Sequence, residues 1–130
     1  MVVHDIILHT KLISCGGTTM EISTNQFKRC DVVKVTGRLD SATAPKLAEE
    51  FARINSEGRF KIVMDFTQLE FISSAGLRVL IATLKNCKRY NRGELVLAGL
   101  PANILSVFDL AGFTSIFKIF DDVLTAVAAF

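Results

Sequence analysis

The sequence predicts an α/β fold in a single domain, with a mixed, mostly parallel central sheet packed by about four helices. Short apolar runs typical of buried strands alternate along the chain with stretches in which apolar residues recur at helical spacing. This alternation favours parallel strands that are joined through helices. The chain has 130 residues and is 50% hydrophobic, which suits one domain with a buried core.

The domain is expected to open with a hairpin. Strands are predicted over 20–27 and 31–39, because apolar and polar residues alternate on both sides of a polar turn. In the second strand, Val33 and Val35 should face one side of the sheet and Val32 the other.

A first helix is predicted from near Ser41, where Pro45 falls in the first turn and is tolerated there. Its buried stripe should contain Leu47, Phe51 and Ile54, while Glu50 should face water. The remaining elements are expected as strands over 60–66, 94–98 and 116–119, and as helices from 73–74 to a break at 90–93, over 102–110, and after a cap at Asp121. The phenylalanines between these last elements are expected to be core residues: Phe108, Phe113, Phe117 and Phe120.

Residues 1–19 are interpreted as an N-terminal extension, either an extra strand or a segment without regular structure, and residues 20–130 as the domain. Gly16 and Gly17 break the chain ahead of the domain. Both histidines, His4 and His9, lie in the extension, and their spacing of five suits neither one strand face nor one helical turn. No metal site is therefore predicted. Self-association through the extension is left open.

Composition narrows the function. The net charge of +2 does not favour nucleic acid, and no run of about 18 apolar residues is present to insert into a membrane. Three widely spaced cysteines form neither a disulfide framework nor a zinc pattern, so reduced thiols in the cytoplasm are expected. A serine hydrolase would need a nucleophile elbow and a base, but the chain has no Gly-x-Ser-x-Gly motif and no histidine after His9. Neither catalysis nor a cofactor is predicted.

Ser73 and Ser74 lie where an extended segment gives way to a helix whose apolar stripe begins at Leu77. One interpretation is structural: a serine oxygen accepts a hydrogen bond from a backbone N–H at the helix start. The other is regulatory: a hydroxyl at the helix start is phosphorylated and gains about two negative charges. The residue pattern alone is compatible with both.

Several motifs occur together and in a fixed order: Gly37-Arg38-Leu39-Asp40, Val63-Met64-Asp65-Phe66, Phe71-Ile72-Ser73-Ser74-Ala75-Gly76-Leu77-Arg78-Val79-Leu80, Leu110-Ala111-Gly112-Phe113 and Ile119-Phe120-Asp121. With these motifs, the chain from about residue 20 to its end resembles the STAS domain of bacterial anti-sigma factor antagonists. The resemblance implies a cytoplasmic domain that binds an anti-sigma factor, a serine kinase with a histidine-kinase-like ATPase fold, and thereby releases sigma factor. It also implies that phosphorylation of a serine breaks the complex, and it leaves room for a serine phosphatase as a further partner.

Carried over by position, the resemblance implies a set of partner-binding residues: Asp40, Ser73, Ser74, Ala75, Gly76 and Arg78. The family motif usually places the phosphorylated hydroxyl directly before the glycine, where this chain has Ala75, and Ser73 replaces the aspartate of the motif. Ser74 is therefore the expected phosphoacceptor, and Ser73 is the alternative. Asp40 could equally serve as a helix cap, and Arg78 as a solvated surface residue.

A second function stays open because Ala75 has no hydroxyl. The chain could be a STAS scaffold or ligand-sensing module that is not phosphorylated, like those of stressosomes or of lipid-transport components.

Overall fold

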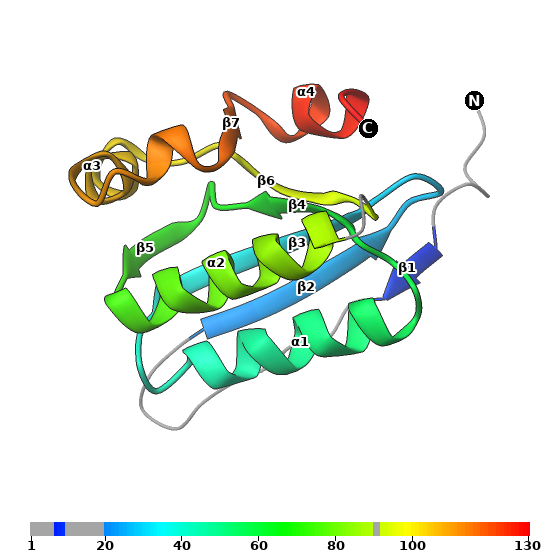
Figure 1. Ribbon diagram of the computed structural model, residues 1–130. Coiled ribbons are helices and arrows are strands. Elements are labelled where there is room, and N and C mark those ends of the chain that lie inside the picture. Colours follow the sequence, from blue (N-terminus) through cyan, green and yellow to red (C-terminus); the bar gives the residue numbers. More distant parts are fainter. Residues whose placement is uncertain (1–6, 10–19, 90–91) are drawn as a thin grey trace.

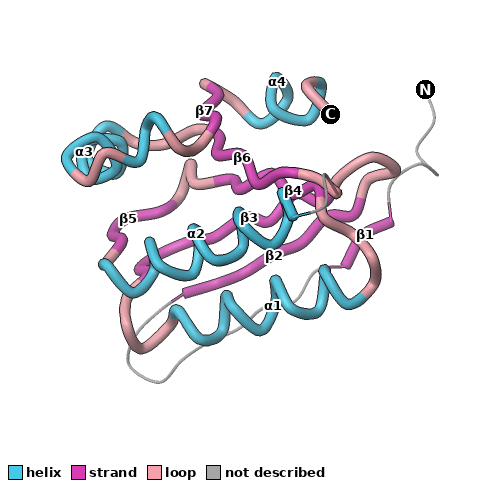
Figure 2. The backbone as a smooth tube through the Cα atoms, viewed as in Figure 1, coloured by secondary structure: helices cyan, strands magenta, loops and turns pink. Residues whose placement is uncertain are grey.

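The computed structural model describes residues 7–9, 20–89 and 92–130 (Figure 1). Within these residues the helices are α1 (Ala44–Ser56), α2 (Ser74–Lys88), α3 (Ala102–Leu110) and α4 (Val123–Ala128), with a 3-10 turn at Phe113–Ser115. The strands are β1 (Ile7–His9), β2 (Met20–Gln26), β3 (Asp31–Leu39), β4 (Lys61–Asp65), β5 (Leu69–Ile72), β6 (Glu94–Ala98) and β7 (Lys118–Phe120). Figure 2 shows strands and helices alternating along the chain after the first hairpin, except that β4 and β5 follow each other directly. The predicted α/β fold, with a mixed and mostly parallel sheet, is confirmed.

The described strands form one sheet in the order β1-β2-β3-β4-β6-β7, and β5 pairs with β3 outside this path. The pairs β1–β2 and β2–β3 are antiparallel, whereas β4, β5, β6 and β7 add in parallel. Helices α1 and α2 lie together on one face of the sheet, and α4 lies on the opposite face (Figure 1). Helix α3 contacts β5 at one end of the sheet.

Strand β5 was missing from the sequence-based prediction, which assigned no strand between residue 66 and the start of α2. Strand β3 explains why it forms. Residues 31–34 of β3 pair with β4, and residues 37–39 pair with β5, with a shift in register between Gly37 and Arg38. The strand has four residues, and its middle two, Glu70 and Phe71, are both exposed. It therefore lacks the alternation by which a half-buried strand is recognised.

The core is divided by the sheet, as the pattern of valines in β3 predicts. Val33 and Val35 belong to the large cluster beneath α1 and α2, and Val32 belongs to a smaller cluster with Ala126 of α4. In α1, the expected stripe of Leu47, Phe51 and Ile54 is buried.

Glu50, expected to face water, is instead buried in α1. Its carboxylate accepts a hydrogen bond from the Thr24 hydroxyl in β2 at 2.5 Å and bonds to the Arg53 guanidinium at 2.7 Å. A buried carboxylate is tolerated when a cation and a hydroxyl replace its lost hydration. Periodicity did not predict this arrangement, because the partner threonine lies on a different element.

Two boundaries near the C-terminus differ from the prediction. Strand β7 begins at Lys118 rather than two residues earlier, since Phe113–Ser115 forms the 3-10 turn. The cap of α4 is Asp122, whose side chain accepts from the Thr125 N–H at 2.7 Å, and not Asp121. Adjacent aspartates offer the same chemistry, and only the backbone path selects between them.

In the first nineteen residues, the structure describes only β1, which pairs with β2. His4 and the two glycines at 16 and 17 lie outside the described residues. None of the helices in the described part of the chain is long and apolar enough to cross a membrane.

The aromatic group at the end of α3 provides a test of the core. Phe108 is fully buried and meets Phe113 and Phe117 edge to face, with ring centroids 6.4 and 5.9 Å away. Phe108→Ala should lower the free energy of unfolding by about 3–5 kcal/mol, because it removes these contacts and leaves a cavity. Leu110→Ala, at a residue that is 90% exposed, should change it by less than about 0.5 kcal/mol. Urea denaturation of both variants measures the difference, and equal losses would contradict this description of the core.

Candidate functional site

The candidate site is built where β3 and β5 end side by side. Leu39 and Ile72 are paired residues, and just beyond them the Ser73 N–H donates to the Leu39 carbonyl at 2.8 Å. This bond places the loop after Leu39, which begins with Asp40, next to the start of α2. The structure thus brings together residues that are more than thirty positions apart in the sequence.

The two serines lie in different environments. Ser73 is the N-cap of α2: its backbone is extended, and its Oγ accepts a hydrogen bond from the Gly76 N–H at 3.4 Å. Its side chain is half-buried, whereas Ser74, the first residue of the helix, is exposed. The capping interpretation therefore holds for Ser73 and leaves the hydroxyl of Ser74 open to solvent.

Ala75 and Gly76 face inward. Ala75 packs against the large core cluster, and Gly76 is buried. A Cβ atom on Gly76 would lie 2.7 Å from Cγ of Leu39 and 3.1 Å from Cγ1 of Ile72, well inside normal contact distance. Gly76 thus allows α2 to approach the ends of β3 and β5 closely. Since it is buried, we assign it to positioning the helix rather than to direct contact with a partner.

Asp40 closes the turn that leads into α1, and the N-cap residue of that helix is Thr43. Its Oδ1 accepts from the backbone N–H groups of Ala42 and Thr43 at 3.0 and 3.2 Å, and the Thr43 hydroxyl lies at 3.3 Å. The Arg38 guanidinium lies 4.0 Å from the other carboxylate oxygen. The side chain of Asp40 is still 23% exposed, so the carboxylate also forms part of the surface beside Ser73.

Phe71 is a surface residue that the sequence-based reasoning did not single out for function. It is 38% exposed on β5, and the Arg38 guanidinium lies over its ring at 4.3 Å from the centroid. Phenylalanine and arginine are among the residue types that are enriched at protein interfaces. The available signal was that Phe71 stands two positions before the cap of α2.

Arg78 and Asp65 have simpler surroundings. Arg78 is exposed, four residues after Ser74 on the same helix, so the two side chains share one face. Asp65 accepts from the N–H and hydroxyl of Thr67 at 3.1 and 2.7 Å, which closes a local turn. In the described part of the chain, no cluster of three or more histidine, cysteine or acidic residues is arranged to hold a metal.

Two of the cysteines, Cys30 and Cys87, are buried free thiols, and Cys15 lies outside the described residues. Burial raises the pKa of both thiols to about 11. Both are therefore protonated at neutral pH and are poor nucleophiles.

Comparison with known proteins identifies the family. The family model described as the STAS domain matches residues 21–126. The chain belongs to the STAS domain family. One relative is BtrV of Bordetella bronchiseptica, a candidate anti-sigma factor antagonist by name. It is 34% identical over 111 residues, which cover 85% of this chain and 95% of BtrV. The anti-sigma-B factor antagonist of Listeria monocytogenes is 29% identical over 101 residues, covering 78% of this chain and 87% of the relative.

Comparison with solved structures confirms the fold. An anti-sigma factor antagonist from Mycobacterium paratuberculosis superposes with a TM-score of 0.74 at 23% identity, covering 88% of this chain and 97% of that protein. The phosphorylated form of the Bacillus cell fate determinant SpoIIAA gives a TM-score of 0.66 at 14% identity and covers 85% and 98% of the two chains.

The separate environments of the two serines predict separate effects on stability. Ser73→Ala removes the capping oxygen and should lower the free energy of unfolding by about 1 kcal/mol. Ser74→Ala, at an exposed position, should change it by less than about 0.5 kcal/mol. Chemical denaturation followed by circular dichroism distinguishes the two variants. A larger loss for Ser74→Ala than for Ser73→Ala would show that the roles are reversed.

The close approach of α2 to β3 predicts that Gly76→Ala is destabilising. The added methyl group must displace Leu39, at a cost of about 1–3 kcal/mol, although alanine favours the helix by about 1 kcal/mol. We expect a net loss of about 1 kcal/mol in the free energy of unfolding. The reverse change at an exposed α2 position, Ala82→Gly, measures the propensity term alone. If Gly76→Ala stabilised the protein by the amount that Ala82→Gly costs, the contact with Leu39 would not be limiting.

Proposed function

We propose that this protein is an anti-sigma factor antagonist. It binds an anti-sigma factor, a serine kinase of histidine-kinase-like ATPase fold, and so releases sigma factor in the cytoplasm. Phosphorylation of Ser74 breaks the complex, and a serine phosphatase would restore it. The names of the relatives support the antagonist function. The observation that carries the proposed switch is the exposed hydroxyl of Ser74 at the start of a 15-residue helix.

The position of Ser74 suits a residue that gains charge. The start of a helix presents unpaired N–H groups and partial positive charge, so a phosphate there is compatible with the folded domain. Ser73 supplies the cap through its own oxygen, and modification of Ser74 leaves that bond in place. Ser74 is also the more accessible of the two serines, which is why we favour it over Ser73 as the phosphoacceptor.

The partner surface that we propose surrounds this hydroxyl. Its exposed or half-exposed members are Asp40, Ser73, Ser74, Ala75 and Arg78, and buried Gly76 holds α2 against β3. A phosphate in the centre of such a surface would have to lose its hydration when the partner binds, and Asp40 beside it adds a like charge. Converting an almost fully bound partner to an almost fully free one takes about 5.5 kcal/mol of differential affinity. Burying a charge that the partner surface does not match supplies a penalty of this size, less what pairing with Arg78 on the same face of α2 offsets.

A STAS scaffold without phosphorylation is the alternative function. It is favoured by one observation: the position directly before Gly76 carries Ala75, whose side chain packs inward and has no hydroxyl.

Phosphate mapping distinguishes the two functions. Incubation with the partner kinase and ATP should add one phosphate, located at Ser74 by mass spectrometry. Ser74→Ala should bind the anti-sigma factor normally but resist release by ATP, and Ser74→Asp should weaken binding by at least about tenfold, because it introduces a charge in the interface.

The matched control is Ser56→Asp, at an exposed serine that ends α1 and lies far from the start of α2. This variant should bind like the wild type. If no phosphate appears on Ser73 or Ser74 while the anti-sigma factor still binds, the switch is wrong and the scaffold function is favoured.

A further inference from the structure

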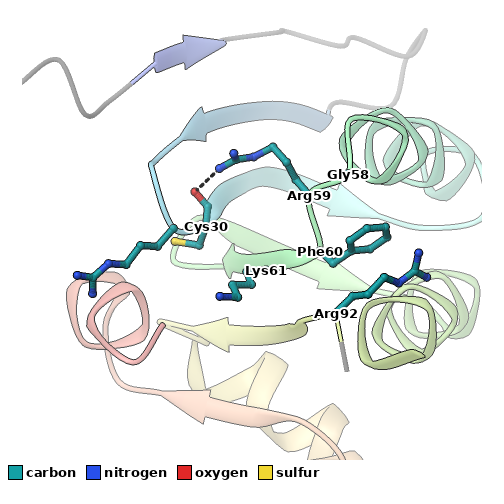
Figure 3. Close-up of a pocket in the computed structure, with 7 residues that line it drawn as sticks. Cys30, Gly58, Arg59, Phe60, Lys61 and Arg92 are labelled. Carbon is teal, nitrogen blue, oxygen red and sulfur yellow. Dashed lines mark hydrogen bonds between the residues drawn. The ribbon is translucent and has the colours of Figure 1, made fainter. Parts of the chain in front are cut away.

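A small pocket lies at the end of the sheet opposite Ser74, where strands β3, β4 and β6 begin. It is about 140 Å³ in volume and lies between the hairpin that joins β2 and β3, the segment from α1 into β4, and the residue Arg92 before β6. Four of its seven lining residues are cationic, and none is acidic: Arg29, Cys30, Gly58, Arg59, Phe60, Lys61 and Arg92 (Figure 3). Helix α2 is about 22 Å long and runs from one end of the sheet to the other, so this pocket is separate from the serine site.

Two of the cations are held in place by the protein. The Arg59 guanidinium bonds to the Asp31 carboxylate at 2.6 Å and to the Cys30 carbonyl at 3.3 Å. The Arg92 guanidinium stacks on Phe60 at 3.8 Å and bonds to carbonyls at the end of α2. These contacts explain why both arginines are present, and they fix positive charge in the walls of the pocket.

The other two cations have weaker partners or none. Arg29 donates to the backbone oxygen of Phe130 at 3.3 Å. The side chain of Lys61 is exposed and forms no hydrogen bond or ion pair with any residue that the structure describes. Its strand neighbour Glu94 lies 3.6 Å from Lys118 instead.

No acidic side chain among the described residues lines the pocket to balance this charge. Figure 3 shows Arg59 and Lys61 on either side of Cys30. Burial raises the pKa of the Cys30 thiol to about 11, so the thiol is neutral. The Asp31 carboxylate is already bound by Arg59. Because four of the lining residues are cationic and none is acidic, the walls of the pocket carry positive charge.

We propose that this pocket binds a small tetrahedral oxyanion, a phosphate or sulfate group, with Lys61 and Arg29 as the direct donors. Arginine and lysine are the side chains that proteins use for phosphate, through charge-assisted hydrogen bonds. The volume sets the size of the ligand. Pockets for drug-sized molecules measure about 300–1,000 Å³, so this one fits a single oxyanion group and leaves the rest of any larger molecule outside. Gly58 forms an open side of the pocket, with no atom within 4 Å of a Cβ built on it.

The test is a titration of the isotope-labelled protein with inorganic phosphate, at an ionic strength held constant with sodium chloride. The amide resonances of Gly58 and Lys61 should shift to saturation. Lys61→Gln should weaken binding by about tenfold, the effect of losing one charge-assisted hydrogen bond. Lys46→Gln, in the first turn of α1 at the other end of the sheet, should bind phosphate like the wild type.

Glycerol 3-phosphate identifies the source of the oxyanion, with glycerol as its control. Tighter binding of glycerol 3-phosphate than of phosphate would indicate an ester as the ligand, and equal or weaker binding a free ion. Arg29→Gln provides a second variant, which should also weaken binding. The proposal is overturned if the shifts do not saturate, or if wild type, Lys61→Gln and Arg29→Gln respond alike.

Discussion

The contact between Leu39 and Gly76 is the constraint on which the candidate site depends. Leu39 is the last residue of β3, and Gly76 lies in the first turn of α2. The absence of a side chain at Gly76 lets the two meet where a Cβ would overlap the leucine. The hydrogen bond from the Ser73 N–H to the Leu39 carbonyl closes the same junction. Together they fix the start of α2 beside Asp40, so that one rim of the sheet carries both the serines and the carboxylate.

At this junction the two neighbouring serines have different roles. The helix start needs an oxygen to accept from its free N–H groups, and Ser73 provides it. Ser74 is then free of a capping role, exposed, and one position before the inward-facing Ala75. The usual family motif has an aspartate where this chain has Ser73, and both residue types are strong caps. Phosphorylation of Ser74, as proposed, therefore leaves the Ser73 cap of α2 intact.

The sequence predicted the regular parts of the fold because they depend on local pattern. Strand β3, strand β6 and helix α3 have the expected bounds, since each is a clear apolar run or stripe. The start of α2 was also predicted, from the change of pattern at Ser73, and a serine cap was one of two interpretations, without a choice between Ser73 and Ser74. Strand β5 was not, because it is short and its pairing depends on β3 running past the end of β4. The burial of Glu50 and the pocket around Lys61 were missed for the same reason: each joins residues from separate elements, and no window of sequence contains them together.

The two ends of the sheet thus have different chemistry. One end carries the hydroxyl of Ser74 and the carboxylate of Asp40, and the other carries the cationic pocket around Lys61. The central claim is that the end of the sheet with Ser74 and Asp40 binds the anti-sigma factor. Hydrogen–deuterium exchange of the protein alone and in that complex tests this claim most directly. The account predicts that binding slows exchange at residues 38–43 and 71–79 and leaves residues 27–30 and 58–61 unchanged. Protection confined to α4 or to the residues of the cationic pocket, with α2 unaffected, would contradict this claim.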